Sequence, residues 1–383
     1  MAFNYSQYHF LTHEPEALLS TIRKFEDSCQ NNKVKVHENE KSIHYPEERN
    51  WTLHSKAMFQ FLGFNSYSNN ITTNSFQRRQ CSSVQDITTS VMSDYGNDEN
   101  CIVPWQSTAS ICRIFSAYST VIWTGDSLTR HTVMALFQYM RENYVNGGFP
   151  PNIAPHLLNG CTCDGQFSEF RMCRVFDVRE YAITPARSQL TSAKKFFCDT
   201  FLGKDFIFRH WIPPPDQYGT AFNELCSSGS SGTSGTSSGD SQRLRFVYLQ
   251  GGAHYRSDPT LWFEEMVRPA LEAILEVRRK CSYPIQDKIR MVISGTNVCD
   301  RIKTDRYPHQ NKSAVFAFMP TIQRLVNLTF PSFPIPMAFL DFSKVTGSAI
   351  DDGRTSEGCH FMTDVNMMKF MTITDLMAAM AEM

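Results

Sequence analysis

One segment, residues 118–140, constrains the fold of this chain more than any other. Tyr118 to Trp123 are mostly β-branched or aromatic residues, and this pattern stops at Gly125. An apolar run of this kind, bounded by a glycine, predicts a buried strand that ends in a tight turn. From Leu128 to Met140 the apolar residues recur at roughly helical spacing, which predicts a helix. Ser127 therefore lies in the turn between a buried strand and a helix.

Strand and helix patterns alternate along the rest of the chain. Further strands are predicted at 170–178, 205–211, 244–249, 289–293 and 337–342. Helices are predicted at 258–279, capped by Asp258 and kinked at Pro269, within 312–326, and from about residue 364. Strands that alternate with helices are typical of a parallel sheet covered on both faces. The pattern therefore predicts a three-layer α/β/α fold with a mostly parallel sheet of about five strands.

Two regions depart from this pattern. Residues 1–100 are polar, rich in Asn, Ser, Thr and Gln, and predict an irregular N-terminal extension. The stretch CSSGSSGTSGTSSGDSQ at 226–242 has no apolar residue after its cysteine, which predicts a flexible, exposed insertion without a catalytic role. We therefore assign residues 101–383 to one domain that this insertion interrupts.

Composition and charge exclude several classes of partner. The chain has 383 residues, of which 42% are hydrophobic, so it can bury a large core. Its 37 basic residues balance 38 acidic ones without a long basic run, which argues against a nucleic-acid partner. No apolar run is long enough to span a bilayer, and the first residues lack the basic start and apolar core of a signal peptide.

The cysteines favour an oxidising compartment. There are 12, an even number, and they are scattered along the chain. Only Cys161, Cys163 and Cys173 lie close together, and they have neither CxxC spacing nor a histidine among them. Disulfides or free core thiols are therefore favoured over a zinc site, and no metal or other cofactor is expected. Possible N-glycosylation sequons occur at Asn4, Asn50, Asn70, Asn311 and Asn327.

Ser127 has two possible roles. Asp126 or Ser127 can cap the following helix by accepting hydrogen bonds from its free N–H groups. A nucleophilic serine instead needs a histidine and an acid nearby. Ligands of parallel sheets bind at the carboxyl ends of the strands. This rule places Ser127 at one edge with Gly252–His254, Gly295–Asn297 and the loop after Asp341.

The segment DDGRTSEGCHF near the end of the chain contains suitable partners. Glu357 lies three residues before His360, and the last predicted helix follows directly. A carboxylate at this spacing can accept a hydrogen bond from one imidazole nitrogen while the other nitrogen faces a serine. His360 taken alone also fits an ordinary loop histidine. Taken together, the motifs predict a Ser127, His360 and Glu357 triad.

The three motifs resemble those of the SGNH (GDSL) hydrolase superfamily. Their order is GDSLTR at 125–130, GAH at 252–254 and EGCH at 357–360. More narrowly, they are similar to the PC-esterase branch, which includes plant trichome-birefringence-like polysaccharide O-acetyltransferases and the luminal domain of sialate O-acetyltransferase. The phrase MAFLDF followed by SEGCHF is also similar to the ending of that branch. The resemblance runs from about residue 101 to the C-terminus and does not cover the insertion.

The resemblance implies serine-dependent acyl transfer on carbohydrate by an O-acetyltransferase or O-acetylesterase. The acyl-enzyme would form on Ser127, with a small acyl donor and with water or a glycan hydroxyl as acceptor. Oxyanion donors would be the backbone N–H groups of Ser127 and Gly252 and the side chain of His254, which occupies the place of the asparagine of the wider superfamily. Arg130 would add positive charge. Asn297 is a second, less favoured donor. The family and the cysteine count together favour the secretory pathway, either the Golgi lumen or the cell exterior.

Aromatic residues near the proposed cleft are candidates for sugar binding. Trp123 and Tyr255 are placed to stack on a sugar ring, although aromatic residues beside buried strands are commonly part of the core.

One departure from the family pattern leaves alternatives open. The family carries Asp at the position of Glu357, and Asp351, Asp352 or Asp364 are other possible acids. A catalytically impaired glycan-binding or structural protein is the second hypothesis. A metal-dependent hydrolase ranks last, because His9 and His13 are the only histidine pair at i, i+4 spacing.

Overall fold

The computed structural model describes the core of the chain. The described residues are 83–92, 106, 108–140, 182–183, 205–210, 222–226, 243–251, 255, 258–281, 285–299, 308–351, 360–361 and 363–383. Most of the N-terminal extension, the strand predicted at 170–178 and nearly all of the Ser/Gly insertion therefore lie outside the described residues. One part of the extension is described: helix α3 (Val84–Met92) buries Ile87 in the core, so this part is not irregular.

The sheet has six strands in the order β2-β3-β1-β4-β5-β6. The five strands from β3 to β6 in this order pair in parallel, and β2 joins β3 at one edge in antiparallel orientation. The strands are β1 (Tyr118–Gly125), β2 (Ala182–Ile183), β3 (Asp205–His210), β4 (Leu244–Gln250), β5 (Ile289–Ser294) and β6 (Met337–Leu340). The predicted α/β class is confirmed, with six strands where about five were expected.

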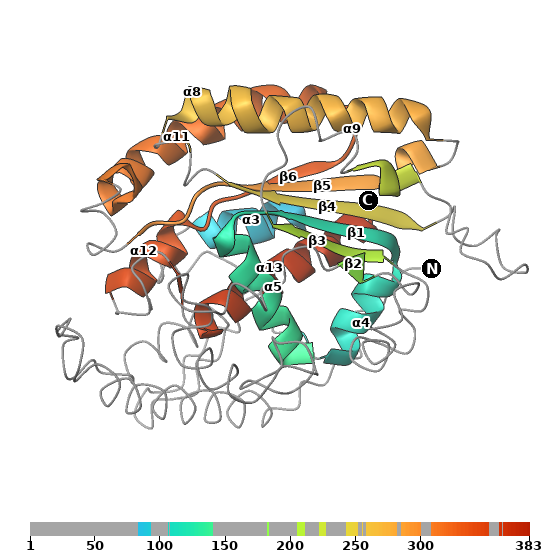
Figure 1. Cartoon of the computed structure of the whole chain (residues 1–383), viewed down its shortest axis with the longest axis horizontal. Helices are drawn as coiled ribbons and strands as arrows, with labels where there is room; N and C mark the ends of the chain where they lie inside the picture. The colour runs from blue at the N-terminus through green and yellow to red at the C-terminus, as the bar shows by residue number, and fades with distance from the viewer. Residues whose placement is uncertain are drawn as a thin grey trace, which may run out of the picture.

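Helices cover both faces of the sheet (Figure 1). One face carries α3, α4 (Thr108–Ser116), α5 (Ser127–Met140) and α13 (Thr363–Ala381), and the other carries α8 (Pro259–Trp262), α9 (Arg268–Lys280) and α11 (Lys312–Thr329). Side chains of β1 alternate between the faces: Val121 and Trp123 pack toward α5 and α13, whereas Ile122 packs toward α9. Each side of the sheet therefore has its own apolar core. Among the described helices, none combines the length and apolar character needed to cross a membrane.

The helix predicted at 258–279 is interrupted. The Asp258 carboxylate caps it by accepting hydrogen bonds from the backbone N–H groups of Thr260 and Leu261. A π-helical turn at Phe263–Val267 then separates α8 from α9. Pro269 lies two residues after this turn, within a helical segment that continues from α8, and it has no N–H to donate to the preceding turn. The irregularity therefore lies just before the proline.

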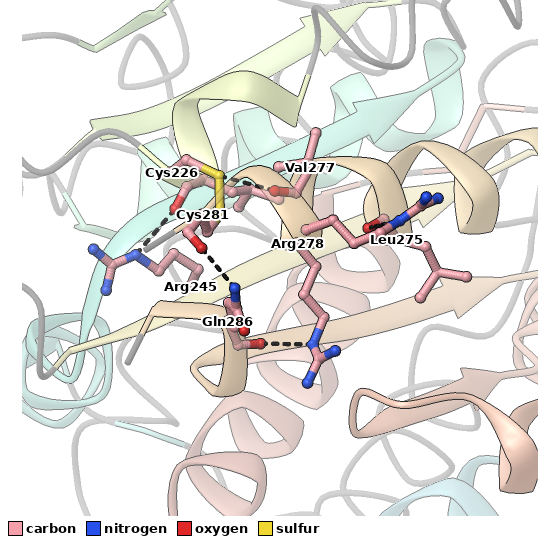
Figure 2. The surroundings of a disulfide bond; sticks show 9 residues. Cys226, Arg245, Leu275, Val277, Arg278, Cys281 and Gln286 are labelled. Carbon is pink, nitrogen blue, oxygen red and sulfur yellow. Dashed lines mark hydrogen bonds between the residues drawn. A yellow bond between two sulfur atoms is a disulfide. The ribbon is translucent and has the colours of Figure 1, made fainter. Parts of the chain in front are cut away.

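Other short elements connect the layers. They are the 3-10 turns η6 (Asn223–Cys226), η9 (Ile285–Asp287), η10 (Pro308–Gln310) and η11 (Phe330–Ser332), and helix α12 (Ser343–Asp351) after β6. A disulfide joins Cys226 of η6 to Cys281 at the end of α9, as Figure 2 shows. Cys112 and Cys299 are also disulfide-bonded, and no described cysteine is free. Of the two alternatives that the sequence left open, disulfides or free core thiols, the structure has disulfides within the described part of the chain.

The strand order creates a switch point between β1 and β4. From β1 the chain goes to β3 on one side, and it then returns to β4 on the other side of β1. The connections after β1 and β4 therefore leave in different directions, toward α5 on one face and α8 on the opposite face (Figure 1). In open parallel sheets, ligands bind in the crevice that such a reversal leaves at the carboxyl ends of the strands.

Candidate active site

The turn that carries Ser127 allows no side chain at Gly125. A Cβ added to Gly125 would lie 2.1 Å from Oγ1 of Thr129 and 2.7 Å from the backbone oxygen of Gln250. Contacts this short are incompatible with any L side chain unless neighbouring atoms shift. The glycine therefore lets the end of β1 pass close to both α5 and β4, which brings Ser127 to the switch point.

Asp126 caps helix α5. Its carboxylate Oδ1 accepts a hydrogen bond from the Leu128 backbone N–H at 2.9 Å, and its carbonyl accepts one from the Arg130 N–H at 3.1 Å. These are the bonds of an N-cap residue. Of the two capping candidates, the structure thus selects Asp126 and leaves the Ser127 side chain free for another contact.

That contact is with His360. Nε2 of His360 lies 2.9 Å from Oγ of Ser127, although the two residues are 233 positions apart. His360 is buried and lies just before α13, which packs beside α5. If the serine hydroxyl donates to Nε2, the proton of a neutral His360 is on Nδ1. The structure therefore brings two predicted site residues together in the geometry that a serine nucleophile and its base require.

A second histidine contacts the first, and sequence reasoning missed it. The rings of His131 and His360 stack with centroids 4.4 Å apart and planes inclined by 9°. His131 is on α5, four residues after Ser127. Its signal in the sequence is this spacing, because residues i and i+4 lie on the same side of a helix.

A buried chain of hydrogen bonds crosses the same edge of the sheet. Oγ1 of Thr129 donates to Oε1 of Gln250 at 2.9 Å, and Nε2 of Gln250 donates to Oδ1 of Asn297 at 3.4 Å. Within the described part of the chain, Nδ2 of Asn297 has no hydrogen-bond partner. A buried, unpaired amide donor is costly unless it serves a ligand. This makes Asn297 a stronger candidate for an oxyanion donor than its sequence context alone indicated. Thr129 and Gln250 belong to the same hydrogen-bond network, and sequence reasoning missed both.

A buried lysine interacts electrostatically with Asp126, the residue before Ser127. Lys369 on α13 is fully buried, and its Nζ lies 5.5 Å from the centroid of the Phe342 ring. No described group makes a hydrogen bond with this amine. Burial lowers the pKa of Lys369 to about 7, and the charge of Asp126 opposes this shift. Sequence reasoning did not identify this residue.

The remaining predicted residues have different outcomes. Glu357, Gly252 and His254 lie outside the described residues, as does Asp352, and the side chain of Asp364 is not described. Their roles stay predictions. Arg130 is buried on α5, and its role as a source of positive charge also stays a prediction.

Trp123 is a core residue. It has no exposed surface, and its ring lies 5.3 Å from that of Tyr248 inside the apolar layer beneath α5 and α13. This burial argues against the sugar-stacking role predicted for Trp123. Tyr255 is half-buried and keeps an accessible side, and burial raises the pKa of its phenol to about 12. Asp351, an alternative acid, forms a surface ion pair with Lys312.

Neither a metal-binding cluster nor a similarity to known proteins identifies the function of this site. Among the described residues, no group of at least three His, Cys, Asp or Glu side chains could hold a metal ion. Comparisons with protein-family models, curated proteins and solved structures find no match for this chain. Assignment of the site therefore depends on the motifs and on the contact between Ser127 and His360.

The packing at Gly125 leads to a prediction about stability. We expect Gly125→Ala to lower the free energy of unfolding by about 3 kcal/mol, since the new methyl group meets a backbone carbonyl. Gly347→Ala is the matched control, because its Cβ would meet only the ends of Phe316 and Lys312 at 3.0 Å or more. That control lies within a helix, where alanine is favoured over glycine. Urea denaturation of both variants measures the effect, and equal midpoints would contradict this account of the turn.

Proposed function

We propose that the protein is a serine-dependent acyl-transfer enzyme of the SGNH hydrolase type, acting on O-acyl groups of carbohydrate. The observation that carries this proposal is the 2.9 Å contact between Oγ of Ser127 and Nε2 of His360. It joins the GDSLTR motif to the EGCH motif across the carboxyl edge of the sheet. The carbohydrate substrate and the acetyl group come from the resemblance of these motifs to PC-esterases.

The proposed reaction has two acyl-transfer steps. His360 accepts the Ser127 proton on Nε2 while Oγ attacks the carbonyl carbon of the acyl donor. The tetrahedral intermediate collapses as His360 returns the proton to the leaving oxygen, which leaves the acyl group esterified to Ser127. Water or a sugar hydroxyl then loses its proton to His360 and attacks the same carbonyl carbon. The second tetrahedral intermediate collapses as His360 returns this proton to Oγ of Ser127, which releases the acyl group as acid or as a sugar ester and regenerates the serine.

Donors near Ser127 would stabilise the oxyanion. Ser127 begins α5 and lies at the positive end of the helix. The Leu128 N–H is bonded to Asp126, so the proposed backbone donor is the N–H of Ser127. Nδ2 of Asn297, which has no hydrogen-bond partner among the described residues, is a second proposed donor, oriented by the hydrogen bond between its Oδ1 and Gln250. Gly252, His254 and Arg130 remain proposed contributors. Glu357 is the proposed acid that orients His360.

The disulfides support a proposed compartment. Each described cysteine is paired, and disulfides persist in oxidising environments. This pattern suits an enzyme that meets glycans in the secretory pathway, in the Golgi lumen or outside the cell.

Detection of the acyl-enzyme tests the proposal. The protein is mixed with p-nitrophenyl acetate, quenched rapidly in acid and analysed by intact mass. We expect a single acetyl adduct in the wild type and in Ser332→Ala, which removes an exposed serine, and no adduct in Ser127→Ala. Peptide mapping should place the acetyl group on Ser127. A folded wild-type protein without an adduct would overturn the proposal and favour the alternative, a glycan-binding or structural protein that has lost catalysis.

A further inference from the structure

We propose that His131 is a positioning residue, which fixes the plane of the His360 ring after Ser127 has been acylated. This inference rests on the proposed function and extends it to the second half of the reaction. It is carried by the parallel stack of the two imidazoles, with a centroid separation of 4.4 Å and an inclination of 9°.

The geometry follows from the spacing on α5. Ser127 and His131 are four residues apart, so both lie on the side of the helix that faces the segment before α13. Cβ atoms of a helix tilt toward its N-terminus, which directs the His131 ring toward the turn that carries Ser127. One helical turn therefore contacts His360 twice: Ser127 meets the edge of the ring at Nε2, and His131 meets its face.

The two contacts restrict different motions. A hydrogen bond at Nε2 fixes one atom of the ring, but it permits rotation about the axis through that atom. Rotation about χ2 of histidine is broad and roughly two-fold, so the covalent geometry does not select one ring plane. A flat neighbour in face-to-face contact does select a plane. The stack therefore supplies orientation that the bond to Ser127 lacks, in addition to the orientation proposed for Glu357.

Acylation removes one of these two contacts. In the acyl-enzyme the Ser127 oxygen carries the acyl group and has no proton to donate to Nε2. His360 must still keep Nε2 directed at the incoming water or sugar hydroxyl, because it takes a proton from that group. The stack with His131 does not depend on the serine proton and persists at this stage. We therefore expect His131 to matter more for deacylation than for acylation.

Two variants separate the flat face from the volume. His131→Leu fills the space without a planar face, and His131→Phe supplies a planar face without ring nitrogens. With p-nitrophenyl acetate, we expect His131→Leu to keep the initial burst and to lower steady-state kcat about 10- to 100-fold. KM should fall in parallel, so that kcat/KM, which reports acylation, changes little. The acetyl adduct should accumulate in this variant. His131→Phe should retain kcat within a few-fold of the wild type, and thermal unfolding should show that both variants are folded.

The outcomes separate this inference from the proposed function. If the wild type forms the adduct on Ser127 and His131→Leu turns over normally, the inference fails and the proposed function stands. Equal losses in the leucine and phenylalanine variants would also overturn it, because the ring nitrogens rather than the planar face would then matter. If the wild type forms no adduct, the proposed function itself is overturned, and the inference about His131 is overturned with it. If His131→Leu does not fold, His131→Met makes the same comparison with a flexible, non-planar chain.

Discussion

Replacing His360 with alanine should lower the rate of ester turnover about 10³- to 10⁴-fold, and replacing Ser127 as well should lower it little further. The two side chains are in direct contact at 2.9 Å, and the proposed chemistry uses them as one unit. Once one member is absent, the other has no reaction to assist. Steady-state kinetics of Ser127→Ala, His360→Ala and the double variant form the cycle that measures this coupling.

The control for this cycle is another histidine. His309→Ala changes a partly exposed histidine of η10 that the proposed chemistry does not use, and it should leave turnover within about 2-fold of the wild type. Losses that multiply in the double variant would show that Ser127 and His360 act independently. Such a result would contradict the dyad even if each single variant were impaired.

The sequence predicted the fold class because strands and helices leave strong periodic patterns. The segment around Ser127 shows this best, since β1 and α5 are found where the apolar patterns place them. The order of the strands in the sheet is harder to predict from the sequence, because it depends on pairing between segments that are distant along the chain. Strand β2 has only Ala182 and Ile183 and is too short for an alternation pattern.

Helix α3 shows why polar composition alone is a poor guide to secondary structure in the N-terminal extension. Its sequence VQDITTSVM is largely polar, and it lies in a region rich in Ser, Thr and Asn. Ile87 is nevertheless buried in the core shared with α13, and Val84 packs against that core. Tertiary packing therefore stabilises a helix that intrinsic propensity alone does not indicate.

The site was partly predictable for a related reason. Ser127 and His360 belong to short motifs whose residue types have a chemical meaning. His131 and Gln250 instead gain their importance from partners that the fold supplies, His360 for the first and Asn297 for the second. A polar residue inside an apolar helix or strand is the available signal. The lysine in the run MMKFM, at Lys369, is the strongest example of this signal.

Lys369 leads to the prediction with the largest effect on stability. Burial lowers its pKa from 10.5 to about 7, and in the described part of the chain no hydrogen bond compensates the amine. We expect Lys369→Met to raise the free energy of unfolding by about 3 to 5 kcal/mol below pH 7. Lys280→Met, which removes an exposed ion pair with Glu276, should change it by less than about 1 kcal/mol at every pH.

The pH dependence gives this prediction its sharpest test. Between about pH 7 and 10.5 the unfolded chain binds the lysine proton and the folded protein does not, so the stability of the wild type rises with pH in this window. Below pH 7 both states are protonated, and the full cost of burying the charge is present. Above 10.5 both states are neutral, and the cost disappears. The advantage of Lys369→Met should therefore be largest at pH 6 to 7 and fall toward zero near pH 10, as urea denaturation across this range measures. A constant advantage would show that methionine only packs better, and that the lysine stays charged or finds compensation when buried.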